Sequence, residues 1–196
     1  LDNLSAGFRW AGPEDVPLVV GGVADDALLD RTIADHGVTA IAHFAARIVV
    51  PESVADPLGY YLGNTAKTRS LLASAVRNGV PNFIFSSTAA VYGNPPVMPV
   101  PEDVPLQPVS PYGRSKLMSE WMLRDLAAAS SKLRYVVLRY FNVAGSDPGG
   151  RIGHSAPAAT LLVKVACQVA AGVRPSLSIF GTAYPTPDGP GVRACI

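Results

Sequence analysis

The chain has 196 residues, 48% of them apolar and 16% charged, so it can bury the core of one large domain, or of one domain and part of a second. A formal net charge of +1 without any block of basic residues gives no reason to expect a nucleic acid or an anionic membrane surface as partner. No stretch of about 18 uninterrupted apolar residues occurs, so no membrane-spanning helix is expected.

The two cysteines, Cys167 and Cys195, lack metal-ligand spacing and do not suggest a disulfide framework. We therefore expect no metal site and a reducing, cytoplasmic setting. The chain starts with Leu1 instead of a methionine and stops soon after a loop. From this we expect it to be part of a longer protein.

The first predicted elements are a strand, a helix and a second strand. Residues 17–22, PLVVGG, form a short β-branched run that ends in glycine, which is typical of a strand. Residues 25–37 carry apolar side chains at helical spacing, with an aspartate to cap the start and Gly37 to end the helix. Residues 38–46, VTAIAHFAA, are the next apolar run and predict the second strand.

A longer helix and a third strand come next. Asp56 suits an N-cap and Pro57 the first helical position, and the helix is expected to extend to Gly79. Residues 82–87, NFIFSS, predict a strand. Between residues 93 and 108 the chain contains six prolines, which exclude a helix or a central strand.

Ser110 and Pro111 begin a further helix by the same capping chemistry. The residues predicted for its core face are Leu117, Trp121 and Leu126. Residues 133–145, LRYVVLRYFNVAG, predict a fourth strand, and residues 159–172 predict a last helix that stops at a glycine.

This alternation of helices with nearly continuous apolar strands predicts an α/β fold with a parallel sheet covered on both faces. In such sheets, ligands bind beyond the carboxyl ends of the strands. The polar residues expected at these ends are Asp2, Asn3, Ser86, Ser87, Thr88 and Asn142.

Tyr112 and Lys116 lie four residues apart on the helix that begins at Ser110. Residues at this spacing share a helix face and lie about 6 Å from one another. An ammonium group at that distance stabilises a phenolate and lowers the pKa of a tyrosine towards neutrality, which gives a general base for an alcohol. The pair alone is a weak signal, because a solvated helical pair has the same spacing. The hydroxyl-rich strand end SSTAAVYG and the long loop before the helix strengthen it.

Several further segments, which follow one another in the order found in a known protein family, extend the tyrosine–lysine signal over residues 1 to about 193. They are LDNLSAG, AIAHFAA, IFSSTAAVYG, SPYGRSKLMSE, LRYFNVAGSDP and SIFGTAYPTPDGPGVR. The chain thereby resembles the extended short-chain dehydrogenase/reductase family, and most closely the UDP-glucose 4-epimerases within it. The resemblance implies a Rossmann-like, doubly wound parallel sheet that is truncated and is followed by the start of a small substrate domain. The implied division is residues 1–150 for NAD binding, without the first strand and helix, and residues 151–196 for an incomplete substrate-binding region.

What the resemblance implies for activity is NAD-dependent epimerisation at carbon 4 of a UDP-hexose, UDP-glucose or UDP-galactose, through a transient 4-keto intermediate. Tyr112 would remove the proton of the 4-hydroxyl. Lys116 would bond the nicotinamide ribose and keep Tyr112 ionised, and Thr88 would position or shuttle the proton. A homodimer of the whole protein is implied as well.

The remaining site residues are also implied by the resemblance. The cofactor would be bound by Asp2, Asn3, Phe44, Ala45, Ala46, Asn64, Ser86, Tyr112, Lys116 and Phe141. The nucleotide sugar would be bound by Thr88, Asn142, Ser178, Ile179, Phe180 and Arg193.

The sequence departs from the family pattern in several places. The Gly-rich turn that binds phosphate is absent, and we expect it upstream of Leu1, so the 196-residue chain by itself is expected to be inactive. Gly22 stands where the family usually has an aspartate that meets the adenine, and Leu161 stands near the place of a substrate-binding asparagine. The last residues, after Arg193, also differ from the family pattern.

Three alternatives remain open. A nucleotide-sugar 4,6-dehydratase would need an acid and a base directly after the threonine, where this chain has Ala89 and Ala90. An epimerase of another UDP-sugar would differ in pocket volume. A non-catalytic nucleotide-binding scaffold would keep the fold and lose the tyrosine–lysine pair.

Overall fold

The computed structural model describes all residues except 131, 156–159, 180, 182, 185–188 and 190–196. The chain divides into two compact units, Leu1–Arg139 and Tyr140–Ile196. The first unit holds the sheet and most of the helices, and each unit is described by itself. The division expected after residue 150 stays a prediction.

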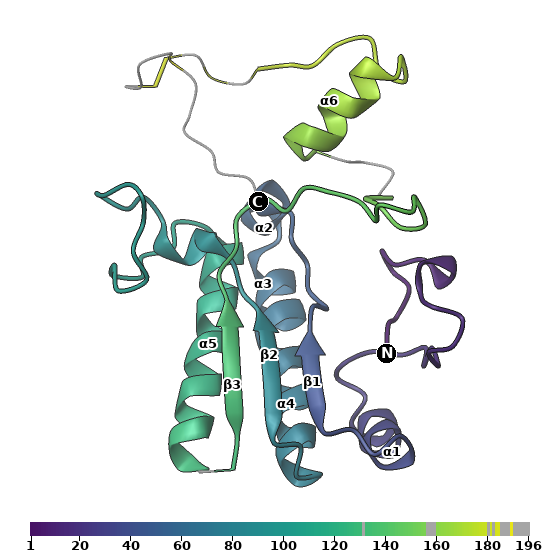
Figure 1. The fold of residues 1–196 in the computed structure, drawn as a ribbon. Helices are drawn as coiled ribbons and strands as arrows, with labels where there is room; N and C mark the ends of the chain where they lie inside the picture. Colours follow the sequence, from purple (N-terminus) through teal and green to yellow (C-terminus); the bar gives the residue numbers. More distant parts are fainter. Residues whose placement is uncertain (131, 156–159, 180, 182, 185–188, 190–196) are drawn as a thin grey trace. The chain divides into compact units, whose positions relative to one another are not determined.

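The first unit is built on a sheet of three parallel strands in the order β1-β2-β3 (Figure 1). The strands are β1 (Ala40–His43), β2 (Asn82–Ser86) and β3 (Arg134–Leu138). Phe83 in the middle of β2 is paired with Ile41 of β1 and with Tyr135 of β3. Their carboxyl ends therefore meet at one edge of the sheet, and the prediction of a parallel α/β sheet is confirmed.

The helices alternate with these strands along the chain. In order, the helical elements of the first unit are η1 (Arg9–Ala11), α1 (Asp26–Asp35), α2 (Val50–Ala55), α3 (Pro57–Tyr60), η2 (Tyr61–Ala66), α4 (Lys67–Arg77), η3 (Ala89–Tyr92) and α5 (Pro111–Ala129). The second unit contains α6 (Leu162–Ala170). The helix predicted from Asp56 to Gly79 is present as α3, η2 and α4, with η2 wound as a π-helix.

The predicted helix starts are capped as the sequence indicates. The Asp56 side chain accepts a hydrogen bond from the backbone N–H of Gly59, and Ser110 Oγ accepts one from Gly113. In both places a proline occupies the first helical position, where its missing N–H leaves no helix hydrogen bond unmade. These caps fix where α3 and α5 begin, and α5 is the helix that carries Tyr112 and Lys116.

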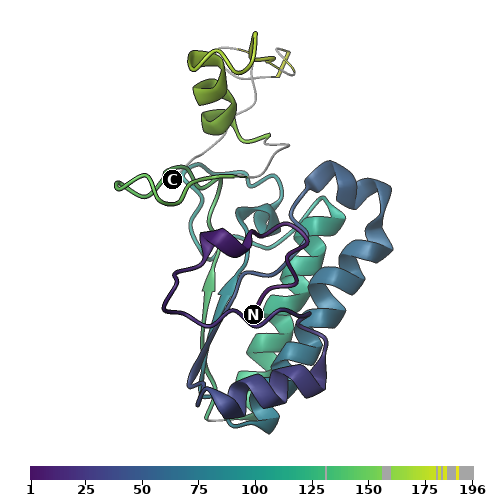
Figure 2. The ribbon, with the colours of Figure 1, turned by 90° about the vertical axis from the view of Figure 1, so that its right-hand side faces the viewer.

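The core of the first unit lies between the sheet and its helices. The buried members of the largest cluster are Leu29, Leu71, Leu72, Phe83, Phe85, Leu123 and Leu133. They come from α1, α4 and α5 on one side and from β2 and the residue before β3 on the other. Figure 2 shows these helices on one side of the sheet.

The opposite face of the sheet is exposed within the first unit, so these residues cover one of the two faces of the doubly wound sheet expected for the whole protein. Ile84 is 39% exposed, Val136 is 53% exposed and Leu138 is 37% exposed. Side chains alternate between the two faces of a strand, so Phe83 and Phe85 can be fully covered while Ile84 between them is not.

Two further expectations need correction. The strand expected at residues 17–22 is reduced to one parallel bridge between Asp2 and Val20, held by hydrogen bonds from Asp2 N to Val19 O and from Gly21 N to Asp2 O. Trp121, expected in the core, is 45% exposed, while Leu117 on the same helix is buried.

The proline-rich stretch forms neither helix nor strand after η3, as predicted. Gly93 opens it with φ +68°, and a Cβ atom there would lie 2.0 Å from the carbonyl oxygen of Gln107. Only glycine allows this approach without strain. The two ends of the loop are thereby held together, next to the start of α5. No helix among the described residues is long and apolar enough to cross a membrane.

Candidate active site

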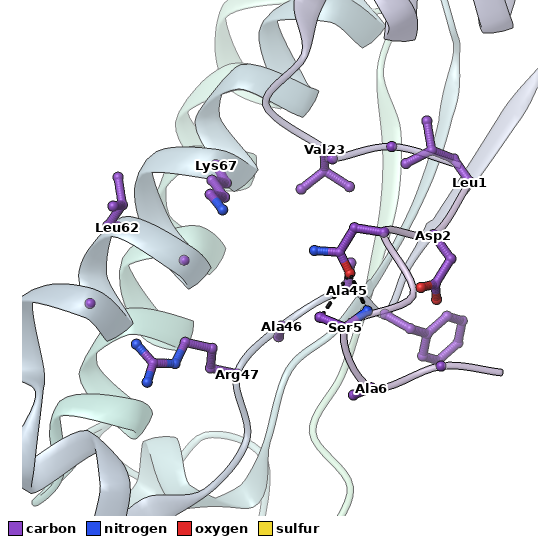
Figure 3. A pocket seen from close by; sticks show the side chains of 17 residues that line it. Leu1, Asp2, Ser5, Ala6, Val23, Ala45, Ala46, Arg47, Leu62 and Lys67 are labelled. Carbon is purple, nitrogen blue, oxygen red and sulfur yellow. Dashed lines mark hydrogen bonds between the residues drawn. The ribbon is translucent and has the colours of Figure 1, made fainter. Parts of the chain in front are cut away.

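A pocket of about 650 Å³ opens at the carboxyl end of β1, between the N-terminal segment and the helices α3 to α4 (Figure 3). It gathers five of the predicted cofactor residues, namely Asp2, Asn3, Phe44, Ala45 and Ala46. Figure 3 shows Arg47 and Lys67 on the helix side and Asp2 on the side of the N-terminal segment.

The groups around this pocket suit a phosphorylated nucleoside. Asp2 offers an exposed carboxylate, of which Oδ1 accepts from the backbone N–H of Leu4 at 2.6 Å. A carboxylate at a strand end can accept from ribose hydroxyls. Gly22 leaves room, since a Cβ atom there would meet nothing within 4 Å. Lys67 brings positive charge to the same pocket, whereas the Arg47 guanidinium is paired with Glu52 and Asp56, each at 2.7 Å. The lining fits the adenosine part of a dinucleotide such as NAD, and Lys67 suits its phosphates.

Lys116 forms the centre of a second group of candidate residues, at the carboxyl end of β2. Its side chain is buried, its Nζ donates a hydrogen bond to Ser86 O at 2.8 Å, and the ammonium lies 5.0 Å from the centre of the Phe85 ring. Burial lowers the pKa of Lys116 to about 8. The group therefore still carries its charge at neutral pH, in a place poor in water.

Tyr112 lies one turn before Lys116 on α5, on the same helix face. Its ring packs edge-to-face on Tyr60, with the ring centres 6.4 Å apart and the planes at 89°. The Tyr60 ring is fully buried, and its hydroxyl lies 2.7 Å from both Val49 O and Glu52 Oε2. Burial and then the bond to Glu52 raise the pKa of Tyr60 to about 12, so it stays a neutral wall against which Tyr112 packs.

Thr88 follows β2 and caps η3. Its Oγ1 accepts a hydrogen bond from the backbone N–H of Ala90 at 3.1 Å, and the residue is 9% exposed. In this bond the hydroxyl is an acceptor, so its hydrogen stays available to a ligand. Ala89 and Ala90, the next two residues, have side chains that transfer no proton.

Asn64 joins the two groups of candidate residues. It lies in the π-helical η2 and is 1% exposed. Its Oδ1 accepts from Arg47 N at 2.8 Å, and its Nδ2 donates to Arg47 O at 2.9 Å and to Ser115 Oγ at 3.0 Å. Ser115 Oγ in turn donates to Tyr112 O at 2.8 Å. The segment after β1 is thus tied to the helix that carries Tyr112, and this role of Asn64 and Ser115 was missed from the sequence, which has no local signal for it.

His43 is buried beneath this site. One ring nitrogen lies 2.8 Å from Thr68 Oγ1, and the ring packs on Phe83 and Phe85. Burial, and next the charge of Lys116, lower the pKa of His43 to about 4. It is therefore neutral at physiological pH and acts as part of the core, as expected.

The other predicted site residues lie elsewhere. Phe141, Asn142, Ser178 and Ile179 belong to the second unit, and Phe180 and Arg193 lie outside the described residues. No group of three or more histidine, cysteine, aspartate or glutamate residues in the described part of the chain could hold a metal ion.

The sequence is similar to that of a known protein family. The sequence profile of the NAD dependent epimerase/dehydratase family matches residues 1–189. A UDP-glucose 4-epimerase of Azospirillum brasilense is 57% identical over 193 residues, which cover 98% of this chain and 55% of that protein. The chain spans about half the length of the curated relatives it matches.

Two solved structures extend the likeness to three dimensions. A UDP-glucose 4-epimerase from Brucella ovis in complex with NAD superposes with a TM-score of 0.89 at 42% identity, covering 95% of this chain and 57% of that one. A UDP-glucose 4-epimerase from Bifidobacterium longum in complex with NAD+ and UDP gives 0.86 at 38% identity, covering 91% and 54%. The Rossmann-like fold expected from the sequence is confirmed by these likenesses.

Proposed function

Because the chain belongs to the NAD dependent epimerase/dehydratase family, we propose that it is part of an NAD-dependent isomerase that inverts carbon 4 of a UDP-hexose. The reaction interconverts UDP-glucose and UDP-galactose through a 4-keto sugar, and the setting is cytoplasmic galactose metabolism. The relatives named above support this activity, and so do the neighbours whose structures contain NAD and UDP.

The pocket beside β1 holds the cofactor in this proposal. Asp2 and Asn3 bind the adenosine ribose, and the small residues Ala45 and Ala46 let the phosphates approach the chain. NAD supplies the acceptor for a hydride at carbon 4 and returns it. Phe141 lies near the nicotinamide, and Ser86 lies at the end of β2, where Lys116 is bonded to its carbonyl oxygen.

Tyr112 is the general base. Its phenolate takes the proton of the sugar's 4-hydroxyl and gives it back after the keto sugar has turned. Lys116 keeps the phenolate stable with its positive charge and bonds the ribose of the cofactor, and Thr88 positions the sugar hydroxyl with the hydrogen of its own hydroxyl. The observation that carries this proposal is the buried, charged Lys116 one helical turn from Tyr112, at the carboxyl end of β2.

The residues of the second unit bind the nucleotide sugar in this proposal. Asn142, Ser178, Ile179 and Phe180 contact the substrate, and the guanidinium of Arg193 is suited to its diphosphate, because a planar fork of donors matches phosphate oxygens.

The complete gene product tests this function. Wild-type enzyme with NAD is expected to convert UDP-galactose to UDP-glucose, and Tyr112→Phe is expected to lower kcat by at least about 100-fold, the usual contribution of a positioned base. Conversion is measured by a coupled assay for UDP-glucose. A Tyr112→Phe variant with full kcat would remove Tyr112 from the role of base.

A nucleotide-sugar 4,6-dehydratase is less well supported, because Ala89 and Ala90 occupy the places of its acid and base. An epimerase of another UDP-sugar is distinguished by assaying UDP-N-acetylglucosamine and UDP-glucuronate beside UDP-galactose. A non-catalytic scaffold would bind nucleotide without converting any of these sugars.

The complete protein is proposed to be a homodimer. Met118 and Trp121 of α5 are 40% and 45% exposed and form an apolar patch on this helix. Large apolar side chains exposed together often mark an interface between proteins. Trp121→Glu is expected to convert the dimer to a monomer in light-scattering measurements, and an unchanged mass would contradict this interface.

A further inference from the structure

Glu120 is buried one helical turn beyond Lys116. It is 6% exposed and accepts a hydrogen bond from Ser87 Oγ through its Oε1. Its Oε2 accepts from Arg139 Nη2 at 2.6 Å and from Arg139 Nε at 3.1 Å. None of these three residues was a predicted catalytic or binding residue, although Ser87 was among the polar residues at strand ends.

Arg139 ties the carboxylate to the rest of the site. It follows β3 directly, its Nη1 donates to Tyr92 Oη at 3.1 Å, and its guanidinium lies 5.2 Å from the centre of the Tyr92 ring. The bonds to Glu120 raise the pKa of Arg139, so the guanidinium keeps its charge. The cluster of Ser87, Tyr92, Glu120 and Arg139 therefore joins α5 to the ends of β2 and β3 and to η3.

Two neighbouring residues of one strand end are held by two successive turns of α5. Lys116 donates to Ser86 O, and Glu120 accepts from Ser87 Oγ. The two contacts lie about 6 Å apart along the helix axis. Together they constrain the position of two successive turns of α5 relative to the end of β2, in addition to the packing of Leu117 and Leu123 in the core. Tyr112 lies one turn before Lys116 on the same face of α5, so Tyr112, Lys116 and Glu120 follow one another at intervals of one turn.

We propose that Glu120, held by Arg139, is a positioning residue: by anchoring the Ser87 hydroxyl it sets the register of α5 on β2 and so the placement of Tyr112 and Lys116 at the carboxyl end of β2. This inference rests on the proposed function, because it concerns the same base and lysine. Glu120 needs Arg139 in this role, since a buried carboxylate without its partner is strongly unfavourable.

The chain contains a second hydrogen-bonded network of the same kind as Ser87, Glu120 and Arg139. Comparing the two distinguishes an effect on the position of catalytic groups from an effect on stability. At the other end of the helical layer, Ser74 Oγ donates to Asp30 Oδ1 at 2.6 Å, and Asp30 is paired with Arg77 at 2.8 Å. This is the same combination of serine, carboxylate and arginine, away from both groups of candidate residues. Ser74→Ala is thus the control for Ser87→Ala, which removes one hydroxyl and leaves the ion pair of Glu120 and Arg139 in place.

Both variants are made in the complete gene product. Ser87→Ala is expected to lower kcat for UDP-galactose by about tenfold with KM little changed, because a small displacement of catalytic groups slows the chemical step. The acid limb of its pH profile is expected to move to higher pH, since a less well placed ammonium stabilises the Tyr112 phenolate less. Ser74→Ala is expected to lower stability and to leave kcat and the pH profile unchanged.

A second readout does not depend on activity. NMR titration of the lysine side chains, assigned with Lys116→Met, follows Lys116 directly. The pKa of Lys116, about 8 in the wild type, is expected to rise in Ser87→Ala, because a loosened helix lets water reach the ammonium. In Ser74→Ala the pKa of Lys116 is expected to keep its wild-type value.

The outcomes are distinguishable. If Ser87→Ala keeps kcat, the acid limb and the Lys116 pKa of wild type while losing as much stability as Ser74→Ala, the cluster is structural only and the inference is wrong. If wild type converts no UDP-hexose, the proposed function fails, and the lysine titration still decides whether this cluster positions Lys116.

Discussion

The ammonium of Lys116 and the imidazole of His43 lie in the same buried region and respond to it in the same direction. Burial lowers the pKa of each, to about 8 for the lysine and about 4 for the histidine, and the positive charge of Lys116 adds to the shift of His43. At neutral pH the lysine is therefore charged and the histidine neutral.

The depressed pKa of His43 predicts how stability depends on pH. Between pH 6.5 and 4 the unfolded chain binds a proton that the folded chain does not, so the free energy of unfolding falls as pH falls through this window, by about 3 kcal/mol in total. His43→Gln, whose amide can still bond Thr68, is expected to flatten the curve. Urea titrations at several pH values measure it.

The exposed His36→Gln variant is the control, and it should keep the wild-type slope. If the free energy of unfolding of His43→Gln fell as steeply with pH as that of the wild type, the pH dependence would come from groups other than His43.

At the scale of elements, helix α5 lies in close contact with η3. Gly113, directly after Tyr112, lies so close to this turn that a Cβ atom would be 2.8 Å from Ala90 O and 2.9 Å from Pro108 Cβ. The first of these is a backbone atom, so the two elements would have to separate. The sequence signature around Tyr112 thus includes a glycine that lets the helix approach the strand end closely.

Gly113→Ala is expected to destabilise the complete protein by about 2 kcal/mol, the usual cost of overpacking. Alanine is favoured over glycine in a helix by about 1 kcal/mol, so propensity alone predicts the opposite sign. The loss of kcat should exceed the loss of stability, because Tyr112 moves with the helix. Thermal unfolding and the epimerase assay measure both effects.

Gly12→Ala controls for the added methyl group outside a helix, since a Cβ atom there would lie 3.9 Å from Arg9 O and the backbone is extended. A Gly113→Ala variant that is more stable than wild type would show that the helix has room to spare at this position.

At the scale of the whole molecule, the open face of the sheet and the pocket beside β1 bear on what these 196 residues are expected to do alone. Ile84, Val136 and Leu138 expose apolar side chains on that face, and the Asp2–Val20 bridge is not paired with the three-stranded sheet. The Gly-rich turn that approaches the phosphates in the family is absent from these residues. The pocket thus offers side chains to a dinucleotide without the backbone N–H groups of such a turn.

We therefore predict that the 196-residue chain alone neither retains NAD in a one-to-one ratio nor converts UDP-galactose, while the complete gene product does both. Isothermal titration calorimetry with NAD and the epimerase assay measure this. Stoichiometric NAD in the purified 196-residue chain would show that its pocket needs no further segment.

Local signals in the sequence determined much of this protein. The caps at Asp56 and Ser110 and the prolines up to residue 108 act within a few residues of themselves, because they restrict φ or satisfy nearby N–H groups. Helix starts, the irregular loop and the alternation of strands and helices were therefore predictable, and the order of motifs indicated the family. Tyr112 and Lys116 are four residues apart, so their shared face was predictable as well.

Tertiary structure alone decided contacts between residues far apart in the chain. Asn64 bonds Ser115, and Ser87 bonds Glu120, across many intervening residues, and no pattern of spacing encodes such pairs. The strand expected at residues 17–22 became a single bridge, and Trp121 faces outward, because pairing and burial depend on which neighbours are present. Propensity and capping are properties of a segment, whereas burial and hydrogen-bond partners are properties of the assembled fold.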